Sequence, residues 1–261
     1  MAKSRYEQHG AVALITMADP ASLNAISPDM TDELDGHFER AVREARCVVL
    51  TGDGRGFSSG ANLARGGPPP IDSDGKVDIG ALLEKKFNGF VTMLRDLPIP
   101  LVTAVNGPAA GIGCSFALLG DIIVAGESAY FLQAFRRIGL VPDGSATYHL
   151  PRMVGRARAM EMMLLGDKLP AAKALEWGLI NRCVPDGELM PTAMRIAEEL
   201  SAGPTKTLGL IRRLAWLSLD ADWAEQLQAE RKAQRTAGRT EDFIEGVQAF
   251  AQKRPAVFKG A

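Results

Sequence analysis

Two glycine-rich turns are the segments of this chain whose residue types could best support chemistry. One covers residues 52–63 and the other residues 106–113, and each stands between an apolar strand and a segment expected to be helical. Such a turn leaves unpaired backbone NH groups at the start of a helix, where negative charge is stabilised. Together the two turns could supply an oxyanion hole of two backbone NH groups. Taken alone, the second turn is better explained as an ordinary strand-to-helix connection.

Neither turn matches a phosphate-binding motif. The first lacks the Lys and Ser/Thr ending of a P-loop, and the second lacks the third glycine of a dinucleotide fingerprint. The three histidines, His9, His37 and His149, are far apart and lack metal-ligand spacing, so we expect them to be structural or surface residues. The sequence therefore indicates neither nucleotide binding through these motifs nor a metal site.

Strands and helices alternate along the first part of the chain. Apolar runs at 10–17 and 47–51 predict strands, and a helix between them should begin at Pro28 with Ser27 as its N-cap. The pattern next predicts a helix at 81–97, a strand from Leu101, a buried helix at 114–119, and strands at 121–125 and 129–132. Helical segments follow near 156–165, 171–177, 188–202, 205–218, 220–237 and 241–253. The alternation predicts an α/β fold.

The last helical segment should begin at Thr240, a good N-cap residue. It carries Phe243, Val247 and Phe250 on one face. That apolar face needs a partner, either in this chain or in another subunit.

Composition excludes several classes of protein. The 261 residues are 46% hydrophobic, and 30 basic against 31 acidic residues give a net charge of −1, so no overall field attracts nucleic acid or an anionic membrane. Cys47, Cys114 and Cys183 lie far apart among apolar neighbours, which is typical of reduced thiols with packing roles. The first residues lack the apolar core of a signal peptide, and Pro and Asn interrupt the apolar region 99–126. We expect a soluble cytoplasmic protein.

Several ordered motifs resemble the signature of the crotonase (enoyl-CoA hydratase/isomerase) superfamily. They are LNAI at 23–26, FSSGANL at 57–63, AVNGPAAGIGC at 104–114 and GDIIVA at 120–125. The resemblance extends from about residue 12 to residue 258, and segments 150–159, 176–179 and 237–246 are similar to the phenylacetate-pathway isomerase branch. It implies a spiral of ββα units at 1–200 and a helical trimerisation region at 201–261, assembled as a homotrimer or as a hexamer.

The resemblance also assigns site residues by position. The NH groups of Ala61 and Ile112 would hold the thioester oxygen of an acyl-CoA, whose coenzyme A is part of the substrate, so that no separate cofactor is expected. Coenzyme A contacts would fall on Ala21, Leu23, Ala25, Ser59, Asn62, Phe258 and Lys259, the last two possibly from a neighbouring subunit. Family members often carry Lys or Arg where Ala21 stands, so Arg65 could hold the phosphates instead.

The family's two hydratase glutamates are replaced. Their positions fall on Ser115 and Phe135, neither of which can act as a carboxylate base, so ordinary hydration is not expected. Asp143 follows in a Pro-Asp-Gly turn, where an aspartate commonly caps its own backbone, but similar isomerases carry their catalytic aspartate at this turn. Apolar surroundings would raise its pKa from about 3.9 and make it a better base. Those surroundings are expected to be Phe135, Ile138, Leu140 and Val141.

The leading hypothesis is an enoyl-CoA isomerase with Asp143 as the acid and base. Asp143 could instead be a nucleophile, as in similar aryl-CoA dehalogenases, although Phe135 stands where those enzymes have a tryptophan. A third alternative is an acyl-CoA-binding scaffold without chemistry. The acyl group stays open between straight-chain, aromatic-derived and cyclic groups, with Phe87, Phe90, Phe135 and the loop 66–80 as candidates for its pocket.

Overall fold

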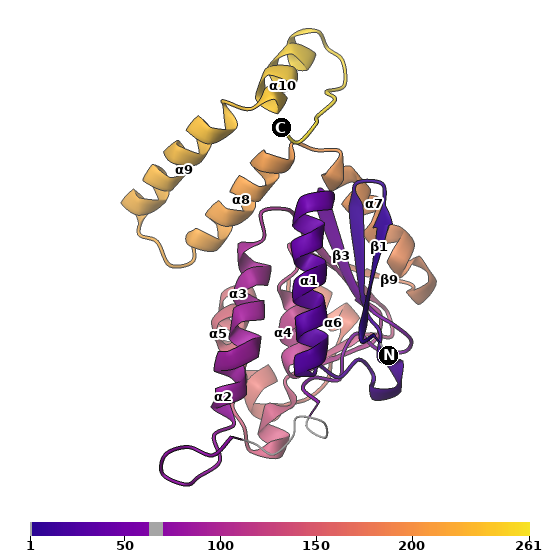
Figure 1. Ribbon diagram of the computed structural model, residues 1–261, viewed down its shortest axis with the longest axis vertical. Helices are drawn as coiled ribbons and strands as arrows, with labels where there is room; N and C mark the ends of the chain where they lie inside the picture. The colour runs from indigo at the N-terminus through magenta and orange to yellow at the C-terminus, as the bar shows by residue number, and fades with distance from the viewer. Residues whose placement is uncertain (1, 63–69) are drawn as a thin grey trace.

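The computed structural model describes residues 2–62 and 70–261, and a six-stranded sheet forms their centre (Figure 1). Its strand order is β1-β2-β3-β4-β6-β9, antiparallel between β1 and β2 and parallel elsewhere. The strands are β1 (Ser4–His9), β2 (Val12–Met17), β3 (Cys47–Gly52), β4 (Leu101–Val105), β6 (Ile122–Gly126) and β9 (Arg182–Val184). The buried parallel strands read as apolar runs because helices cover both faces of the sheet.

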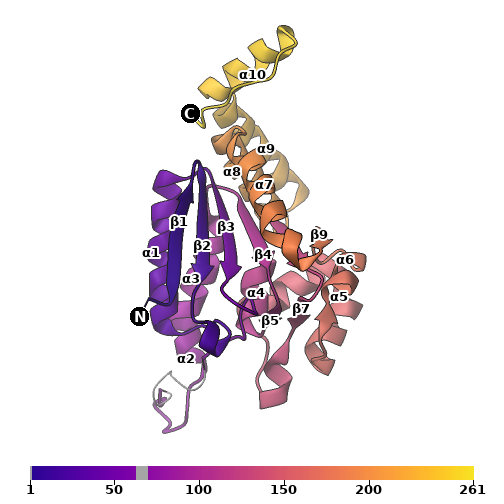
Figure 2. The ribbon, with the colours of Figure 1, turned by 90° about the vertical axis from the view of Figure 1, so that its right-hand side faces the viewer.

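The two faces of the sheet bury alternate residues of each strand. On β3, Val48 and Leu50 pack with α1 (Pro28–Glu44) and α3 (Asn88–Asp96), whereas Cys47 and Val49 pack against α7 (Leu189–Ser201). This period of two follows from the pleat of a strand. Figure 2 shows α1 and α3 on one side of the sheet and α7 on the other.

A second, three-stranded sheet contains β5 (Pro108–Ala110), β7 (Tyr130–Leu132) and β8 (Leu169–Pro170). Between β4 and β5 the chain passes so close to the first glycine-rich turn that a Cβ on Gly107 would lie 2.2 Å from the carbonyl oxygen of Arg55. No side chain fits there. The second glycine-rich turn is therefore packed directly on the first.

The earlier of the remaining helices pack in the core, and the last ones extend away from it. The buried α4 (Ile112–Leu118) follows β5, and α2 (Gly80–Leu82) continues through a π-helical turn at Leu83–Phe87 into α3. The later helices are α5 (Ala146–Leu165), α6 (Ala171–Glu176), α7, α8 (Thr205–Leu217), α9 (Trp223–Ala237) and α10 (Glu241–Ala251). In both ribbon views α9 and α10 project from the sheet core (Figures 1 and 2).

Buried Arg212 anchors α8 to the core. Its Nε donates to Asp121 Oδ2 at 2.7 Å, and its terminal nitrogens donate to the carbonyls of Leu94, Arg95 and Leu97 at the end of α3. Asp121 Oδ2 also accepts the NH of Leu101, the first residue of β4. Burial raises the pKa of the Asp121 carboxyl, and the charge of Arg212 opposes that rise. A single ion pair thus ties three segments together.

Most predicted elements are confirmed, with shifted ends. Ser27 accepts the NH of Met30 and caps α1, and Thr240 accepts the NH of Phe243 and caps α10. The predicted helix at 156–165 is confirmed as the second part of α5: Gly155, with φ of +76° and ψ of 160°, breaks the helix, and the sequence prediction missed the first part at 146–154. The division into 1–200 and 201–261 stays a prediction.

Several strands of the structure were absent from the sequence prediction. β1 is an edge strand of largely polar residues without apolar alternation, β5 lies inside what reads as a turn, and the very short β8 and β9 add two further strand segments to the sheets. No helix in the described part of the chain is long and apolar enough to cross a membrane.

Removing the Arg212 side chain should destabilise the protein strongly. Arg212→Met leaves the half-buried Asp121 carboxylate and three carbonyls without their buried partner, which should cost about 3 kcal/mol of unfolding free energy in urea at neutral pH. The control is Arg40→Met, which breaks the exposed 2.7 Å pair with Glu44 and should cost less than about 1 kcal/mol. Equal costs for the two variants would contradict the role given to Arg212.

Candidate active site

A short parallel bridge sets the direction of the Ala61 NH. Ile26 donates its NH to the Gly60 carbonyl and accepts from the Asn62 NH, both at 2.8 Å. Because a residue between two such bonds points its own NH to the opposite side, the Ala61 NH faces away from Ile26.

A second parallel bridge, between Ser58 and Ala109, fixes the backbone of the second glycine-rich turn. The Ser58 NH donates to the Pro108 carbonyl at 3.0 Å, and the Ser58 carbonyl accepts the Ala110 NH at 2.9 Å. The Gly111 NH donates to the Leu132 carbonyl at 2.9 Å. Ile112 is then the first residue of α4, where an NH has no acceptor within the helix.

Gly60 and Gly111 bring the two NH groups together. A Cβ on Gly60 would lie 2.9 Å from the Ala110 carbonyl oxygen and 3.7 Å from the Gly111 Cα. Both glycines have positive φ, +98° and +53°, which side chains disfavour. Among the described residues, no hydrogen bond is found for the NH of Ala61 or of Ile112. The two turns thus present a pair of free donors from adjacent backbone, which is the arrangement that an oxyanion requires.

The Asp143 turn packs on the same end of α4. A Cβ on Gly144 would lie 2.8 Å from Ser115 Cβ and 3.0 Å from Ile112 Cγ1. The Ser115 hydroxyl donates to the Asp143 carbonyl at 3.0 Å, and the Ala146 NH donates to the same oxygen at 3.1 Å. Asp143 therefore stands beside Ile112, which carries one of the two free NH groups.

The Asp143 carboxyl is in the state expected of a general base. Its Oδ1 is buried and has no hydrogen-bond partner among residues 2–62 and 70–261. Burial raises its pKa from 3.8 to about 6, because desolvation disfavours the charged form. A carboxyl with this pKa is largely ionised at neutral pH and accepts a proton more readily than an exposed aspartate does.

The predicted apolar surroundings of Asp143 are only partly right. Phe135 is buried, with its ring facing Gly111, but Ile138, Leu140 and Val141 are 55%, 37% and 80% exposed. The chain reverses at the left-handed Gly139 and turns those three side chains toward solvent. The Asp143 turn packs on α4 instead.

Ser115 has a partner that the sequence alone did not identify. Its hydroxyl donates to the Asp143 carbonyl. No local pattern could reveal this bond because 28 residues separate the two partners. Of the residues expected at the acyl pocket, Phe90 packs in the core against Phe38 and Phe116 and is 1% exposed.

Most of the coenzyme A candidates lie together. Ser59 donates its NH to the Leu23 carbonyl and its hydroxyl to the Ser22 carbonyl, each at 2.8 Å. Asn62 bonds the Ile26 carbonyl on the same edge. Within this group Ala21 and Ser59 are exposed, Leu23 and Asn62 are half-buried, and Ala25 is buried. Arg65, the candidate for the phosphates, lies outside the described residues.

Phe258 and Lys259 are not near the other candidates within one chain. Arg46, just beyond the C-terminal end of α1, donates to the Phe258 carbonyl at 3.1 Å, and the Lys259 NH donates to Asp242 on α10. The other candidates surround the loop before the N-terminal end of α1. Since α1 has 17 residues, about 25 Å of helix separates the two groups.

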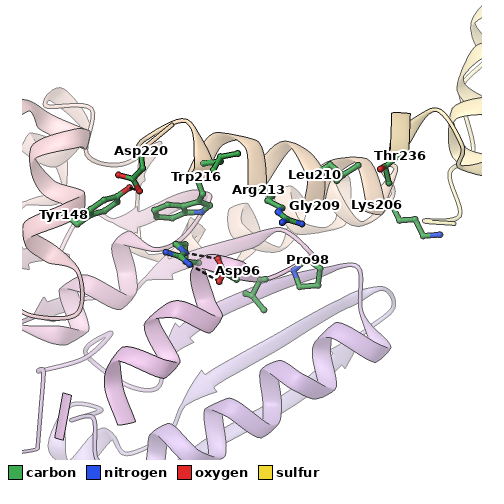
Figure 3. Close-up of a pocket in the computed structure, with 13 residues that line it drawn as sticks. Asp96, Pro98, Tyr148, Lys206, Gly209, Leu210, Arg213, Trp216, Asp220 and Thr236 are labelled. Carbon is green, nitrogen blue, oxygen red and sulfur yellow. Dashed lines mark hydrogen bonds and ion pairs between the residues drawn. The ribbon is translucent and has the colours of Figure 1, made fainter. Parts of the chain in front are cut away.

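A cavity of about 780 Å³ lies apart from these candidates, between the end of α3 and α8. Its lining includes Arg95, Tyr148, Arg213 and Trp216 (Figure 3), and none of the candidate residues lines it.

The described residues hold no group of three or more His, Cys, Asp or Glu side chains that could bind a metal ion. The cysteines also offer no reactive thiolate. All three cysteines are free, and burial raises the pKa of Cys47 and Cys114 to about 12, so neither is a reactive thiolate.

Comparisons with known proteins show the family of the chain. Residues 7–261 match the model of a family described as enoyl-CoA hydratase/isomerase. The chain is 42% identical over 252 residues to the 1,2-epoxyphenylacetyl-CoA isomerase of Escherichia coli (strain K12), covering 95% of each chain. It is 39% identical to the "Probable enoyl-CoA hydratase" of Rhodobacter capsulatus, covering 98% of this chain and 97% of that one. The solved enoyl-CoA hydratase of Bacillus anthracis superimposes with a TM-score of 0.91 at 28% identity, over 99% of this chain and 100% of that one.

The raised pKa of Asp143 should be visible in both titration and stability. The folded protein binds this proton more tightly than the unfolded chain, so the stability from this group is complete below pH 4 and is lost as the pH rises through 6. Asp143→Asn should therefore unfold at higher urea than wild type at pH 8, by roughly 1 to 2 kcal/mol after allowance for residual solvation, with little difference near pH 4.

Carboxyl carbon NMR of Asp143 provides the direct measurement, with a midpoint near pH 6. The control is Asp53, whose pKa is lowered by its hydrogen bond to Arg5, so that Asp53→Asn should not stabilise the protein at pH 8. An Asp143 midpoint at the ordinary aspartate value of about 4 would contradict the burial described above.

Proposed function

The chain belongs to the enoyl-CoA hydratase/isomerase family of acyl-CoA enzymes, and from this premise we propose that it moves the double bond of a 3-enoyl-CoA into conjugation with the thioester. Its fold is the α/β crotonase fold that the sequence motifs implied. The particular reaction, the residues that perform it and the acyl group are the proposal.

Two backbone NH groups and one carboxylate suffice for this reaction. The NH groups of Ala61 and Ile112 hold the thioester oxygen, and Asp143 removes a proton from C2. The electron pair of the broken C–H bond moves into the dienolate, whose negative charge gathers on that oxygen. Asp143 then returns the proton to C4, which leaves the double bond between C2 and C3. No water enters, and the carboxyl ends in the state in which it began.

The state of the Asp143 carboxyl is the observation that supports this proposal most. Its buried Oδ1 has no hydrogen-bond partner in the described part of the chain, and burial brings its pKa to about 6. A structural carboxylate in such a place would be paired, because unpaired burial is unfavourable. A base that must exchange a proton with substrate needs its oxygen free. Losing one oxyanion donor typically raises the activation free energy by roughly 3 to 4 kcal/mol. We therefore expect each of the two NH groups to lower the barrier by a similar amount.

Hydration is the second candidate, because relatives such as the Rhodobacter capsulatus protein are named as hydratases. Addition of water needs groups that activate it and protonate the enolate. Ser115 and Phe135 occupy the two positions expected for those groups, and the Ser115 hydroxyl is already donated to the Asp143 carbonyl. These observations favour isomerisation over hydration. An attack by Asp143 as a nucleophile would leave a covalent acyl-enzyme, which mass spectrometry during turnover would detect.

Substrate binding is proposed to involve a neighbouring copy of the chain. Ala21, Leu23, Ala25, Ser59 and Asn62 would contact coenzyme A on one subunit, and Phe258 and Lys259 would come from another. Large apolar side chains on α9 and α10 are exposed in the single chain, as an assembling surface requires: Trp223, Phe243, Ile244, Val247 and Phe250. A homotrimer or hexamer in the cytoplasm, without a separate cofactor, fits these features.

The acyl group is proposed to include aromatic-derived substrates. The Escherichia coli relative is named for an isomerisation of 1,2-epoxyphenylacetyl-CoA. A substrate panel should therefore contain straight-chain, cyclic and ring-derived enoyl-CoA thioesters, with isomerisation and hydration scored separately.

Replacing Asp143 should abolish isomerisation while leaving binding intact. Asp143→Asn keeps the size of the side chain but cannot accept the proton, so kcat for 3-enoyl-CoA should fall by about 10² to 10⁴, with little change in KM. The absorbance of the conjugated product measures the rate. Asp222→Asn is the matched control, because Asp222 caps α9 far from the site and asparagine caps equally well.

Equal isomerisation rates of wild type and Asp143→Asn would contradict the role of Asp143 as the base. Hydration that persists in Asp143→Asn at the wild-type rate would favour hydration as the function.

A further inference from the structure

Two consecutive left-handed residues follow Asp143. Gly144 has φ of +58° and Ser145 has φ of +68°, and α5 begins directly after them. Glycine adopts this conformation freely, whereas a residue with a Cβ adopts it only where its surroundings hold it there. Ser145 is thus a place where the fold must supply a compensating interaction.

The Ser145 side chain makes that interaction in two directions. Its hydroxyl donates to the Gly144 carbonyl, and His149 Nε2 lies 3.4 Å from its Oγ. Ser145 precedes the first turn of α5 and His149 lies four residues later, so the two side chains meet on one face of the helix. Since the hydroxyl proton goes to the carbonyl, Oγ can only accept from His149, which requires the tautomer with its proton on Nε2.

His149 is buried and neutral. It is 5% exposed, and its ring packs 4.8 Å from the ring of Trp216 on α8 and 5.6 Å from that of Tyr148. Figure 3 shows Tyr148 and Trp216 at one end of the cavity beside α8. Burial lowers the pKa of His149 to about 4, so the imidazole is neutral at physiological pH and carries one ring proton.

Both carbonyls beside Gly144 are therefore held by serine hydroxyls. Ser115 holds the Asp143 carbonyl at 3.0 Å, and Ser145 holds the Gly144 carbonyl. The Asp143 Oδ1 has no hydrogen bond to any described residue, so nothing attached to that oxygen fixes its position. The position of the carboxyl must come from the backbone of this turn.

We propose that Ser145 and His149 are positioning residues, which hold the left-handed turn after Asp143 and so fix where its carboxyl stands relative to the Ala61 and Ile112 NH groups. This inference rests on the role proposed for Asp143. It implies that the imidazole is needed because residue 145 carries a side chain. A glycine at this position would keep the turn without help.

The test is a cycle of variants at the two positions. Ser145→Ala keeps the Cβ and removes the hydroxyl, and His149→Leu keeps an apolar bulk and removes the donor. Each should lower kcat for the isomerisation roughly 10- to 100-fold with a smaller change in KM, because a displaced carboxyl impairs proton transfer more than binding. The kcat of Ser145→Gly should stay within about threefold of the wild-type kcat, because glycine adopts the left-handed conformation freely. Adding His149→Leu to Ser145→Gly should then lower kcat no further.

His149→Gln should retain most of the activity, because its amide NH can reach the position of Nε2. The matched controls are Ser218→Ala, which removes a hydroxyl bonded to the Ala215 carbonyl, and His37→Leu on α1. Both should leave kcat unchanged. Urea unfolding accompanies each variant, so a loss of fold is separated from a loss of position.

Three kinetic results would overturn the proposal: full activity of Ser145→Ala, full activity of His149→Leu, or an equal effect of His149→Leu in the wild-type and Ser145→Gly backgrounds. The last would mean that His149 only packs against Trp216. Carboxyl NMR of Asp143 in the same variants reports its surroundings without turnover. If Asp143→Asn proved active, the proposed function would fail, whereas an unchanged Asp143 signal in Ser145→Ala and His149→Leu would overturn the positioning role alone.

Discussion

The close approach of two backbone segments at Gly60 and Gly111 is the constraint on which the site depends. A Cβ on Gly60 would lie 2.9 Å from the Ala110 carbonyl oxygen, so the segments meet only because that side chain is absent. Two parallel bridges, at Ile26 with Ala61 and at Ser58 with Ala109, keep them in register. The free NH groups of Ala61 and Ile112 follow from this geometry, and the strands of the sheet serve to deliver both turns to one place.

The turn that carries Asp143 is linked to the C-terminal helix α8 through His149 and Trp216. Burial raises the pKa of Asp143 toward neutrality but also leaves its Oδ1 without a partner among the described residues. Its position must then be maintained by the backbone. Trp216 on α8 packs on His149, and Arg212 ties α8 to the core, so α8 supports the turn after Asp143. The raised pKa of Asp143 and the place of its carboxyl both depend on how this turn packs on its neighbours.

Local sequence patterns were sufficient to predict the two turns, most of the strands and the helix caps. Ser27 before Pro28 acts on neighbouring residues, and the glycines of both turns mark the turns by their type, so a single sequence reveals them; the contact between the two turns is a product of folding. The bond from Ser115 to Asp143 and the exposure of Val141 depend on segments that meet only after folding. The polar edge strand β1 and the strand β5 depend equally on their partners. The functional assignment came largely from family motifs, since a Pro-Asp-Gly turn alone indicates a cap.

The thioester carbonyl stretch of a bound, unreactive acyl-CoA would report directly whether the NH groups of Ala61 and Ile112 hold the thioester oxygen. With a ¹³C-labelled carbonyl, infrared difference spectra report how strongly two NH groups polarise that oxygen. We expect a stretch at lower frequency in the complex than in water, and a loss of most of that shift in Gly60→Ala, where the added Cβ forces the two turns apart. A bound carbonyl with its frequency in water, or an unchanged shift in Gly60→Ala, would contradict this role of the two NH groups.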